Sequence, residues 1–133
     1  MIFTIDPESA KDLDDALSLE KLQDDLFEIG IHIADVSHFV EQNTAIDLDA
    51  QQRCTSCYLP HRVIKMLPDV LTENLCSLTT GKNRFAFSVL VQINSLGIIQ
   101  SKPRFCKSII NSCAKLSYIT VQDIIDKKII NSS

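Results

Sequence analysis

The sequence predicts an α+β fold with a mixed, mostly antiparallel sheet and flanking helices. Two pairs of segments with alternating apolar residues are each joined by a short turn-like stretch, as in β-hairpins. Threonines stand before two stretches that read as helices, where a hydroxyl can cap the first turn. The chain has 133 residues, of which 45% are hydrophobic, so it is long enough to bury one core.

The N-terminal third contains three expected strands: residues 2–5, 16–22 and 26–36. Asp6-Pro7 ends the first strand, because proline cannot donate a hydrogen bond to a sheet. The second and third strands form a hairpin around Gln23-Asp24-Asp25. Alternation places Ile29, Ile31 and Ile33 on one face of the third strand, which indicates a buried sheet.

The rest of the chain also reads as helices and strands. Thr44 caps a helix from Ala45 to about Cys57, which Tyr58-Leu59-Pro60 interrupts. Thr120 caps a terminal helix that runs toward Ile130. The elements expected between these two helices are a short helix over residues 71–78 and strands over 85–94 and 97–107, paired around Ser95-Leu96-Gly97.

Composition limits the function classes. Seventeen acidic against thirteen basic residues give a net charge of −4, which argues against an independent surface for binding nucleic acid. Any nucleic acid would therefore meet a local patch or a metal ion. No apolar run approaches the roughly 18 residues needed to span a bilayer, and the N-terminus lacks a targeting pattern. We expect a soluble intracellular protein with no membrane partner, cytoplasmic or also nuclear.

Five cysteines cannot all pair internally, which favours a reducing compartment. Cys54 and Cys57 have CxxC spacing, so the pair is compatible with half a zinc site or a redox pair. No second CxxC or HxxxH completes a zinc ligand set. Buried thiols are the plainer interpretation, and a redox or zinc protein stays open as an alternative.

Four aspartates crowd the stretch FTIDPESAKDLDDALS: Asp6, Asp12, Asp14 and Asp15. Without a cation, carboxylates so close together repel one another, and some of their pKa values rise. A folded chain therefore gains by binding a hard divalent metal at this loop, because carboxylate oxygens are the ligands that such ions prefer. The density of aspartates predicts a metal site.

Besides a metal site, the acidic loop has two other interpretations: an EF-hand and a solvated loop. An EF-hand counted from Asp12 would need glycine at its sixth place and glutamate at its twelfth, but these are Leu17 and Gln23. A solvated acidic loop is the simpler alternative. Against it, Asp6 closes a strand that reads as buried, and Leu13 and Leu17 draw the loop toward a core, where unpaired charge is costly.

The strings TIDPESAKDLDDALS, IGIHIADVSHFV, RCTSCYLPHRVIKMLPDVLTENLCSL and RFAFSVLVQI together resemble the catalytic RNB domain of the ribonuclease II family, along nearly the whole chain. The stretch KSIINSCAKLSY is most similar to Dis3-like eukaryotic exonucleases. The resemblance implies hydrolytic 3′-to-5′ degradation of single-stranded RNA to nucleoside 5′-monophosphates, with Mg²⁺ or Mn²⁺. It also implies that this chain is the N-terminal part of an incomplete domain. Partners such as the exosome or other RNA-decay factors would bind regions outside it.

Matching the motif by position implies roles for individual residues. Asp6, Asp12, Asp14 and Asp15 take the family's metal-binding places, with Asp6 and Asp15 as direct ligands. Asp12 helps hold a second metal through the RNA, and Asp14 is the residue whose replacement abolishes cleavage while sparing RNA binding; these two are the expected catalytic residues. Tyr58 falls where the family places an aromatic ring against the 3′-terminal base.

Four other polar residues lie in the family-like strings. Lys11 is compatible with steering phosphate or with simple solvation. His32 alternates within a strand, which favours a packed, hydrogen-bonded imidazole over a general base. Asp35 and Arg53 are expected to fix structure through ion pairs. Besides the exonuclease and the zinc or redox protein, a non-catalytic RNA-binding or interaction module that retains the fold stays open.

Overall fold

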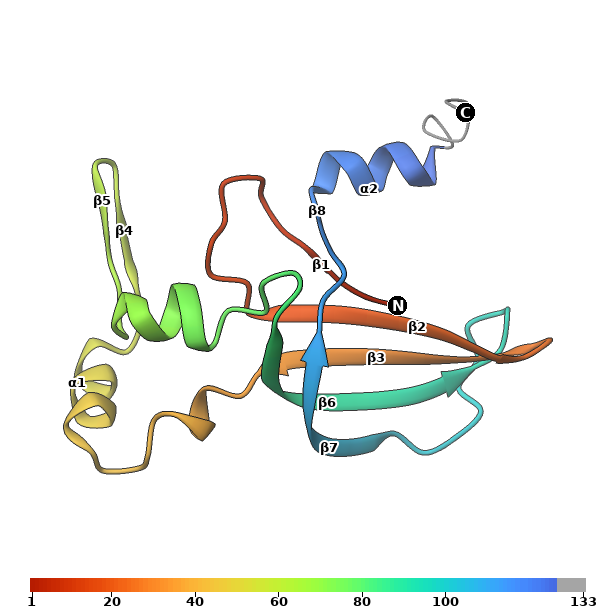
Figure 1. Cartoon of the computed structure of the whole chain (residues 1–133), viewed down its shortest axis with the longest axis horizontal. Coiled ribbons are helices and arrows are strands. Elements are labelled where there is room, and N and C mark those ends of the chain that lie inside the picture. Colours follow the sequence, from red (N-terminus) through yellow and green to blue (C-terminus); the bar gives the residue numbers. More distant parts are fainter. Residues whose placement is uncertain (127–133) are drawn as a thin grey trace.

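The computed structural model of the chain describes residues 1–126, which form a six-stranded mixed sheet with helices and a separate hairpin beside it (Figure 1). The sheet order is β7-β6-β3-β2-β1-β8. Its strands are β1 (Ile2–Ile5), β2 (Asp15–Gln23), β3 (Leu26–Ala34), β6 (Asn83–Ile93), β7 (Arg104–Asn111) and β8 (Ala114–Leu116). Only the β1–β8 pair is parallel. The predicted α+β class with a mostly antiparallel sheet is confirmed.

The hairpin of β2 and β3 is the centre of the sheet. Leu17 faces Ile31 and Asp15 faces Ile33 across the pair, and the turn lies at Asp24-Asp25, as the sequence predicts. β6 then adds antiparallel to β3, with Ile31 opposite Val89. β-branched residues pack well on such a pleated surface, which is why these apolar runs become strands.

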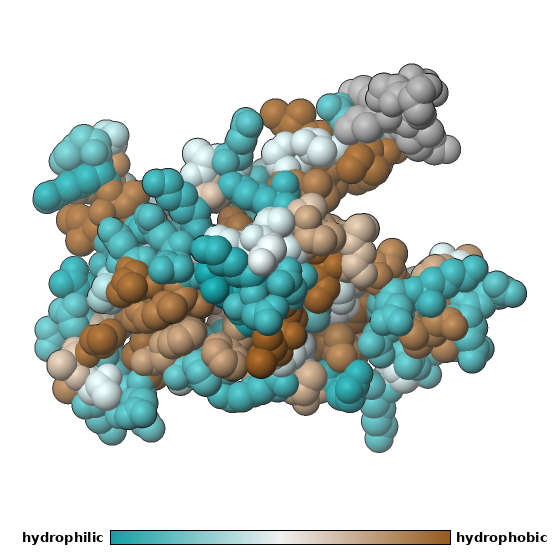
Figure 2. Space-filling model, in the orientation of Figure 1, coloured by the Kyte–Doolittle hydropathy of each residue, from teal (hydrophilic) through white to brown (hydrophobic). Residues whose placement is uncertain are grey.

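The two faces of the sheet differ in size and burial. One face carries small residues such as Ala16, Ala34 and Ala86, and it packs against Leu13, Leu71 and Leu78 to make the core. Side chains alternate between the faces of a strand, so the neighbouring residues point the other way. On that opposite face, large apolar side chains remain exposed: Ile31, Ile33, Phe85, Phe87, Phe105 and Ile109. In the view of Figure 2, hydrophobic residues likewise reach the surface among hydrophilic ones.

The first helix is shorter than predicted. A short 3₁₀ turn, η1 (Val36–His38), precedes α1 (Ala45–Arg53), which Thr44 caps as expected. α1 ends at Arg53 and not near Cys57, because Cys54 has a left-handed backbone with φ of 61°. The chain then forms an unpredicted hairpin of β4 (Cys57–Leu59) and β5 (Arg62–Ile64), which projects from the body of the molecule (Figure 1).

The second predicted helix is present but has a wider turn. η2 (Val70–Leu75) is a π-helix, and it ends before residues 76–78. Those three residues leave the helix because Leu78 N–H donates a hydrogen bond of 2.9 Å to the carbonyl of Leu13, and Ser77 also bonds to the aspartate loop. The early end of η2 therefore follows from long-range pairing with the N-terminal loop.

The strand predicted over residues 97–107 is displaced toward the C-terminus. The turn at Ser95-Leu96-Gly97 is present, but β7 begins only at Arg104, and Ile99 makes a single bridge to Ile93. The side chain of Asn94 accepts hydrogen bonds from the N–H groups of Leu96 (3.1 Å) and Ile98 (2.9 Å), so it holds this segment as a wider loop.

The last helix, α2 (Tyr118–Ile125), begins earlier than predicted. Its cap is Ser117 and not Thr120, because the Ser117 hydroxyl accepts the N–H of Thr120 at 3.1 Å. The predicted continuation toward Ile130 lies outside the described residues. Within residues 1–126, no helix is both long and apolar enough to cross a membrane.

Candidate active site

Asp6 follows β1 directly and enters a buried position. Its N–H donates a hydrogen bond of 3.0 Å to the carbonyl of Leu116, which continues the parallel pairing of β1 with β8 by one residue. Only 9% of Asp6 is exposed, and its Oδ2 atom is buried without a hydrogen-bond partner. A buried carboxylate oxygen with no donor is costly, so a cation would stabilise this group.

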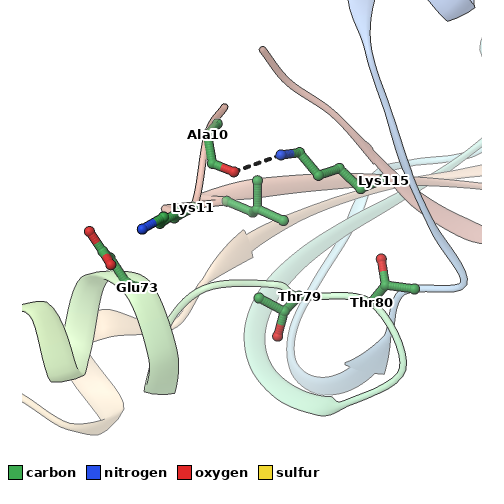
Figure 3. Close-up of a pocket in the computed structure, with 7 residues that line it drawn as sticks. Ala10, Lys11, Glu73, Thr79, Thr80 and Lys115 are labelled. Atoms are coloured by element: carbon green, nitrogen blue, oxygen red, sulfur yellow. Dashed lines mark hydrogen bonds between the residues drawn. The ribbon is translucent and has the colours of Figure 1, made fainter. Parts of the chain in front are cut away.

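The loop from Pro7 to Asp14 is held from two sides. From β8, the ammonium of Lys115 donates hydrogen bonds to the carbonyls of Glu8 (2.9 Å) and Ala10 (2.6 Å), the second of which is drawn in Figure 3. From the segment after η2, the Ser77 hydroxyl binds the loop backbone around Asp12. Figure 3 also shows Lys11 pointing toward Glu73. The loop is therefore tethered by residues more than sixty positions away in the chain.

Asp12 and Asp14 do not line the pocket beside Lys115. They line a different cavity of about 340 Å³. Tyr58 of the projecting hairpin lines the same cavity. The remaining lining residues are Ile33, Ala34, Val36, Ser56, Met66, Leu67, Thr72 and Cys76. The cavity therefore combines two carboxylates and an aromatic ring with a largely apolar wall.

The four aspartates are electrostatically coupled at Asp14. Partial burial raises the pKa of the Asp14 carboxyl, and the negative charges of Asp12, Asp15 and Asp6 raise that pKa further. Asp14 nonetheless keeps an exposed side, as does Asp15 at the start of β2. The structure thus brings all four predicted aspartates into one field of negative charge.

The donor set fits a hard divalent cation. All four side chains offer carboxylate oxygens, and the unpartnered Oδ2 of Asp6 is a free acceptor. In the described part of the chain, however, no three His, Cys, Asp or Glu side chains converge into a group that could hold a metal. The aspartates therefore provide suitable ligand atoms, but among the described residues they are not arranged as a preformed metal site.

Tyr58 is placed as an outward-facing aromatic residue. It is 73% exposed and pairs with Val63 across the β4–β5 hairpin. Tyr58 is therefore not a core residue. A ring that is exposed at the edge of a cavity with two carboxylates is available to stack on a planar ligand.

Three residues near η2 belong to the site but were not predicted from the sequence. Thr72 lines the cavity, and its Oγ1 is buried without a partner. Cys76 lines it as well, and burial, followed by the charge of Asp14, raises the pKa of its thiol. Ser77 is fully buried behind the aspartate loop. No motif spacing identifies these residues, because they reach the loop only through tertiary pairing.

The polar residues expected to be structural are structural. His32 is buried, and its two ring nitrogens lie 2.6 Å from the Ser88 hydroxyl and 3.0 Å from the Ser18 hydroxyl, so the packed imidazole is confirmed. Asp35 pairs with Lys107 at 3.0 Å, and Arg53 pairs with Asp49 at 2.7 Å within α1. Burial lowers the pKa of His32, which keeps the ring neutral.

The CxxC pair does not form a recognisable site. Cys54 and Cys57 are both exposed free thiols, so the interpretation that they are buried is wrong. Across residues 1–126, no further His, Asp or Glu joins them in a group of three metal-ligating side chains. The Sγ of Cys54 donates to the carbonyl of Gln51, which is a local contact at the end of α1.

Comparison with known proteins shows which family the chain resembles. The family model described as RNB domain matches residues 1–133. DIS3-like exonuclease 2 of Xenopus tropicalis is 52% identical over 131 residues, which are 96% of this chain and 16% of that protein. A protein named inactive exonuclease DIS3L2, of Arabidopsis thaliana, is 50% identical over 127 residues, covering 96% of this chain and 12% of that protein.

The same architecture occurs in a solved structure. Mycoplasma genitalium RNase R, determined in complex with ribose-methylated single-stranded RNA, superposes with a TM-score of 0.86 at 33% sequence identity. The match covers 96% of this chain and 20% of that protein. The chain thus spans about a fifth or less of the length of each of these relatives.

Proposed function

The chain belongs to the RNB domain family, and on that premise we propose that it provides the metal-holding part of a hydrolytic 3′-to-5′ exoribonuclease for single-stranded RNA. The family contains 3′-to-5′ exoribonucleases, which in general depend on divalent metal, and also members named inactive. The chain spans only 16% of DIS3-like exonuclease 2, so the proposal includes action within a longer protein.

One observation carries the proposal: Asp12, Asp14 and Tyr58 line a single cavity, and the other two aspartates act electrostatically on Asp14. A phosphodiester needs neutralisation of charge at phosphorus, while a terminal base needs a flat apolar partner. The cavity offers both kinds of group on its wall. This combination suits the 3′ end of a single strand.

Each aspartate has a proposed task. Asp6 and Asp15 would ligate a divalent ion directly, and Asp12 would share a second ion with the RNA. When bound, two such ions, Mg²⁺ or Mn²⁺, would polarise the phosphate and stabilise the attacking and leaving oxygens. Asp14 contributes its charge to the cleavage step and not to RNA binding, so its replacement by asparagine removes turnover alone.

The proposed reaction is hydrolysis of the last phosphodiester bond. Water attacks phosphorus, and the bond from phosphorus to the 3′ oxygen of the preceding nucleotide breaks. The products are a nucleoside 5′-monophosphate and an RNA one nucleotide shorter with a free 3′ hydroxyl. Tyr58 would stack on the terminal base, and stacking tolerates every base because each has a flat face.

A degradation assay tests this proposal. The purified chain is incubated with 5′-labelled single-stranded RNA in Mg²⁺ or Mn²⁺, and products are resolved at single-nucleotide steps. We expect stepwise shortening from the 3′ end that stops with a chelator and with Asp15→Asn. Asp24→Asn serves as the matched control, because Asp24 lies in the exposed β2–β3 turn, where it pairs with Lys21. Shortening that persists in the chelator would refute metal-dependent hydrolysis.

A second candidate is a non-catalytic RNA-binding module. The observations that favour it are the 50% identity to a protein named inactive and the lack of three convergent metal ligands among residues 1–126. This alternative expects RNA affinity without turnover, and affinity that is unchanged when the aspartates are replaced. Fluorescence anisotropy with labelled RNA, run beside the degradation assay, separates the two functions.

A further inference from the structure

Ser77 makes two hydrogen bonds to the aspartate loop that lie on either side of Asp12. Its hydroxyl oxygen accepts the N–H of Leu13 at 3.1 Å, and its proton is donated to the carbonyl of Lys11 at 2.7 Å. Ser77 is 0% exposed, so no solvent competes for these bonds. One side chain thus closes a bridge across a single aspartate.

These bonds replace a sheet ladder that the loop lacks. Buried backbone N–H and C=O groups need partners, and a strand obtains them from its neighbour. A serine hydroxyl has one donor and two acceptor lone pairs, so it can satisfy a carbonyl and an N–H at once. Immediately after Ser77, the N–H of Leu78 binds the carbonyl of Leu13 at 2.9 Å. Residues 77–78 therefore set the backbone of the segment from Lys11 to Leu13.

The bridge decides which side chains face the cavity. Leu13 is 3% exposed and belongs to the core, while Asp12 and Asp14 line the cavity. Lys11 and Leu13 both line a different pocket, next to Lys115. Successive side chains of the loop thus point to alternate sides, as in a strand. Rotation of the backbone at Leu13 would therefore move Asp12 and Asp14 together.

We propose that Ser77 is a positioning residue that fixes the Asp12 and Asp14 carboxylates toward the cavity and thereby sets the affinity for a divalent ion. This inference rests on the proposed function for the role of the ion, but its structural part concerns the loop alone. Ser77 itself touches neither metal nor RNA; it acts through the backbone of Lys11 and Leu13.

Three variants separate positioning from general stability. Ser77→Ala removes both hydrogen bonds, and Ser77→Thr keeps the hydroxyl. Ser112→Ala is the matched control, because Ser112 is also buried at 1% exposure and its hydroxyl donates a 3.0 Å hydrogen bond to a backbone carbonyl, that of Ala114. For each variant of the 133-residue chain, Mn²⁺ affinity is measured by electron paramagnetic resonance, thermal stability by circular dichroism, and exchange of the Leu13 amide by NMR.

We expect Ser77→Ala to weaken Mn²⁺ binding about 10- to 100-fold, as is typical when a group that orients metal ligands is lost. Leu13 amide exchange becomes faster in the same variant. Ser77→Thr restores most of the affinity, and Ser112→Ala lowers thermal stability without changing the affinity.

Mn²⁺ affinity of Ser77→Ala within about twofold of wild type would overturn the inference, as would an equal loss in Ser112→Ala. If the wild-type chain binds no Mn²⁺, the metal-dependent proposed function fails. Exchange of the Leu13 amide then still tests whether Ser77 holds the loop. Faster Leu13 exchange would then support the structural part of the inference, that Ser77 holds the loop backbone, and unchanged exchange would overturn it. If Ser77→Ala does not fold, Ser77→Cys supplies the same comparison against Ser112→Ala, because a thiol is only a weak donor and acceptor.

Discussion

Lys115 of β8 donates a 2.6 Å hydrogen bond to the carbonyl of Ala10, more than a hundred residues earlier in the chain. A second hydrogen bond of 2.9 Å reaches the carbonyl of Glu8. The start of the aspartate loop is therefore held by a residue of β8, the strand that pairs with β1. This contact connects the stability of the C-terminal part of the sheet to the shape of the candidate site.

Replacement of Lys115 by methionine should destabilise the chain by about 1–2 kcal/mol, because two loop carbonyls lose a charged donor while the apolar length of the side chain is kept. Urea unfolding followed by circular dichroism measures this change. Lys102→Met, which alters an exposed lysine of the β6–β7 loop, should leave the free energy of unfolding unchanged. Equal stability of Lys115→Met and wild type would show that these bonds do not hold the loop.

Asp14→Asn should raise the melting temperature of the chain at neutral pH without added divalent ions. The reason is that partial burial, and then the negative charges of three other carboxylates, raise the pKa of Asp14 and disfavour its charged form. Added Mg²⁺ should stabilise the wild type more than this variant, since a ligand that binds only the folded state raises its stability. Differential scanning fluorimetry, with Asp24→Asn as the exposed control, checks both statements; a lower melting temperature for Asp14→Asn would contradict the first.

Stability should fall as the pH is lowered from about 7 toward 5, with His32 as a main cause. Burial lowers the pKa of His32 in the folded chain below its ordinary value of 6.5. The unfolded chain therefore binds a proton first, and stability that is present above pH 6.5 is lost as the pH falls through the folded pKa. Unfolding free energies between pH 5 and 7.5 measure the slope.

The order of donors and acceptors around His32 indicates which ring nitrogen of the neutral imidazole carries the proton. Ser108 donates to the carbonyl of Ala86, so Ser88 donates to Ser108 and accepts from Nδ1 of His32. Nε2 is then the acceptor for Ser18, and a second ring proton would break this order. Gly30 leaves the space for the ring, since a Cβ there would lie 2.6 Å from Nε2.

His32→Gln should flatten the pH dependence of stability, whereas His61→Gln, at an exposed histidine of the β4–β5 hairpin, should not. An NMR titration of the His32 ring gives its pKa directly and needs no variant. A His32 pKa at or above 6.5 would contradict the assignment.

Tyr58→Ala should weaken binding of single-stranded RNA about 5- to 150-fold, which corresponds to about 1–3 kcal/mol for one stacked base. Tyr58→Phe keeps the flat face and should bind like the wild type. Because Tyr58 is exposed on a hairpin, its truncation leaves the core intact. Fluorescence anisotropy in a chelator isolates binding from cleavage, and an unchanged affinity of Tyr58→Ala would remove the tyrosine from the site.

The sequence predicts the central strands because their signal is local. Alternation at Ile29, Ile31 and Ile33 is sufficient to identify β3, and the polar turn before it identifies the hairpin. β8 has only three residues and exists because it pairs with β1, which lies over a hundred positions earlier. The β4–β5 hairpin is not predicted, because the sequence pattern extends the preceding helix to about Cys57, whereas the positive φ of Cys54 ends α1 earlier.

In the candidate site, too, some residues have a local sequence signal and others are placed only by long-range contacts. The four aspartates are evident from their density, since they lie within ten consecutive positions of the chain. Thr72 and Ser77 join the site through the early end of η2, which depends on pairing with Leu13. Such contacts have no local sequence signal, because each involves residues about sixty positions apart.

Separation of RNA binding from RNA cleavage at Asp14 tests the central claim most directly. Affinity for 5′-labelled single-stranded RNA and the rate of 3′ shortening in Mg²⁺ are measured on the wild-type chain and on Asp14→Asn under identical conditions. The account predicts a nearly unchanged affinity and a rate at least about a hundredfold lower, as is typical when a charge used only in the transition state is lost. Equal rates of shortening in the two proteins would contradict it.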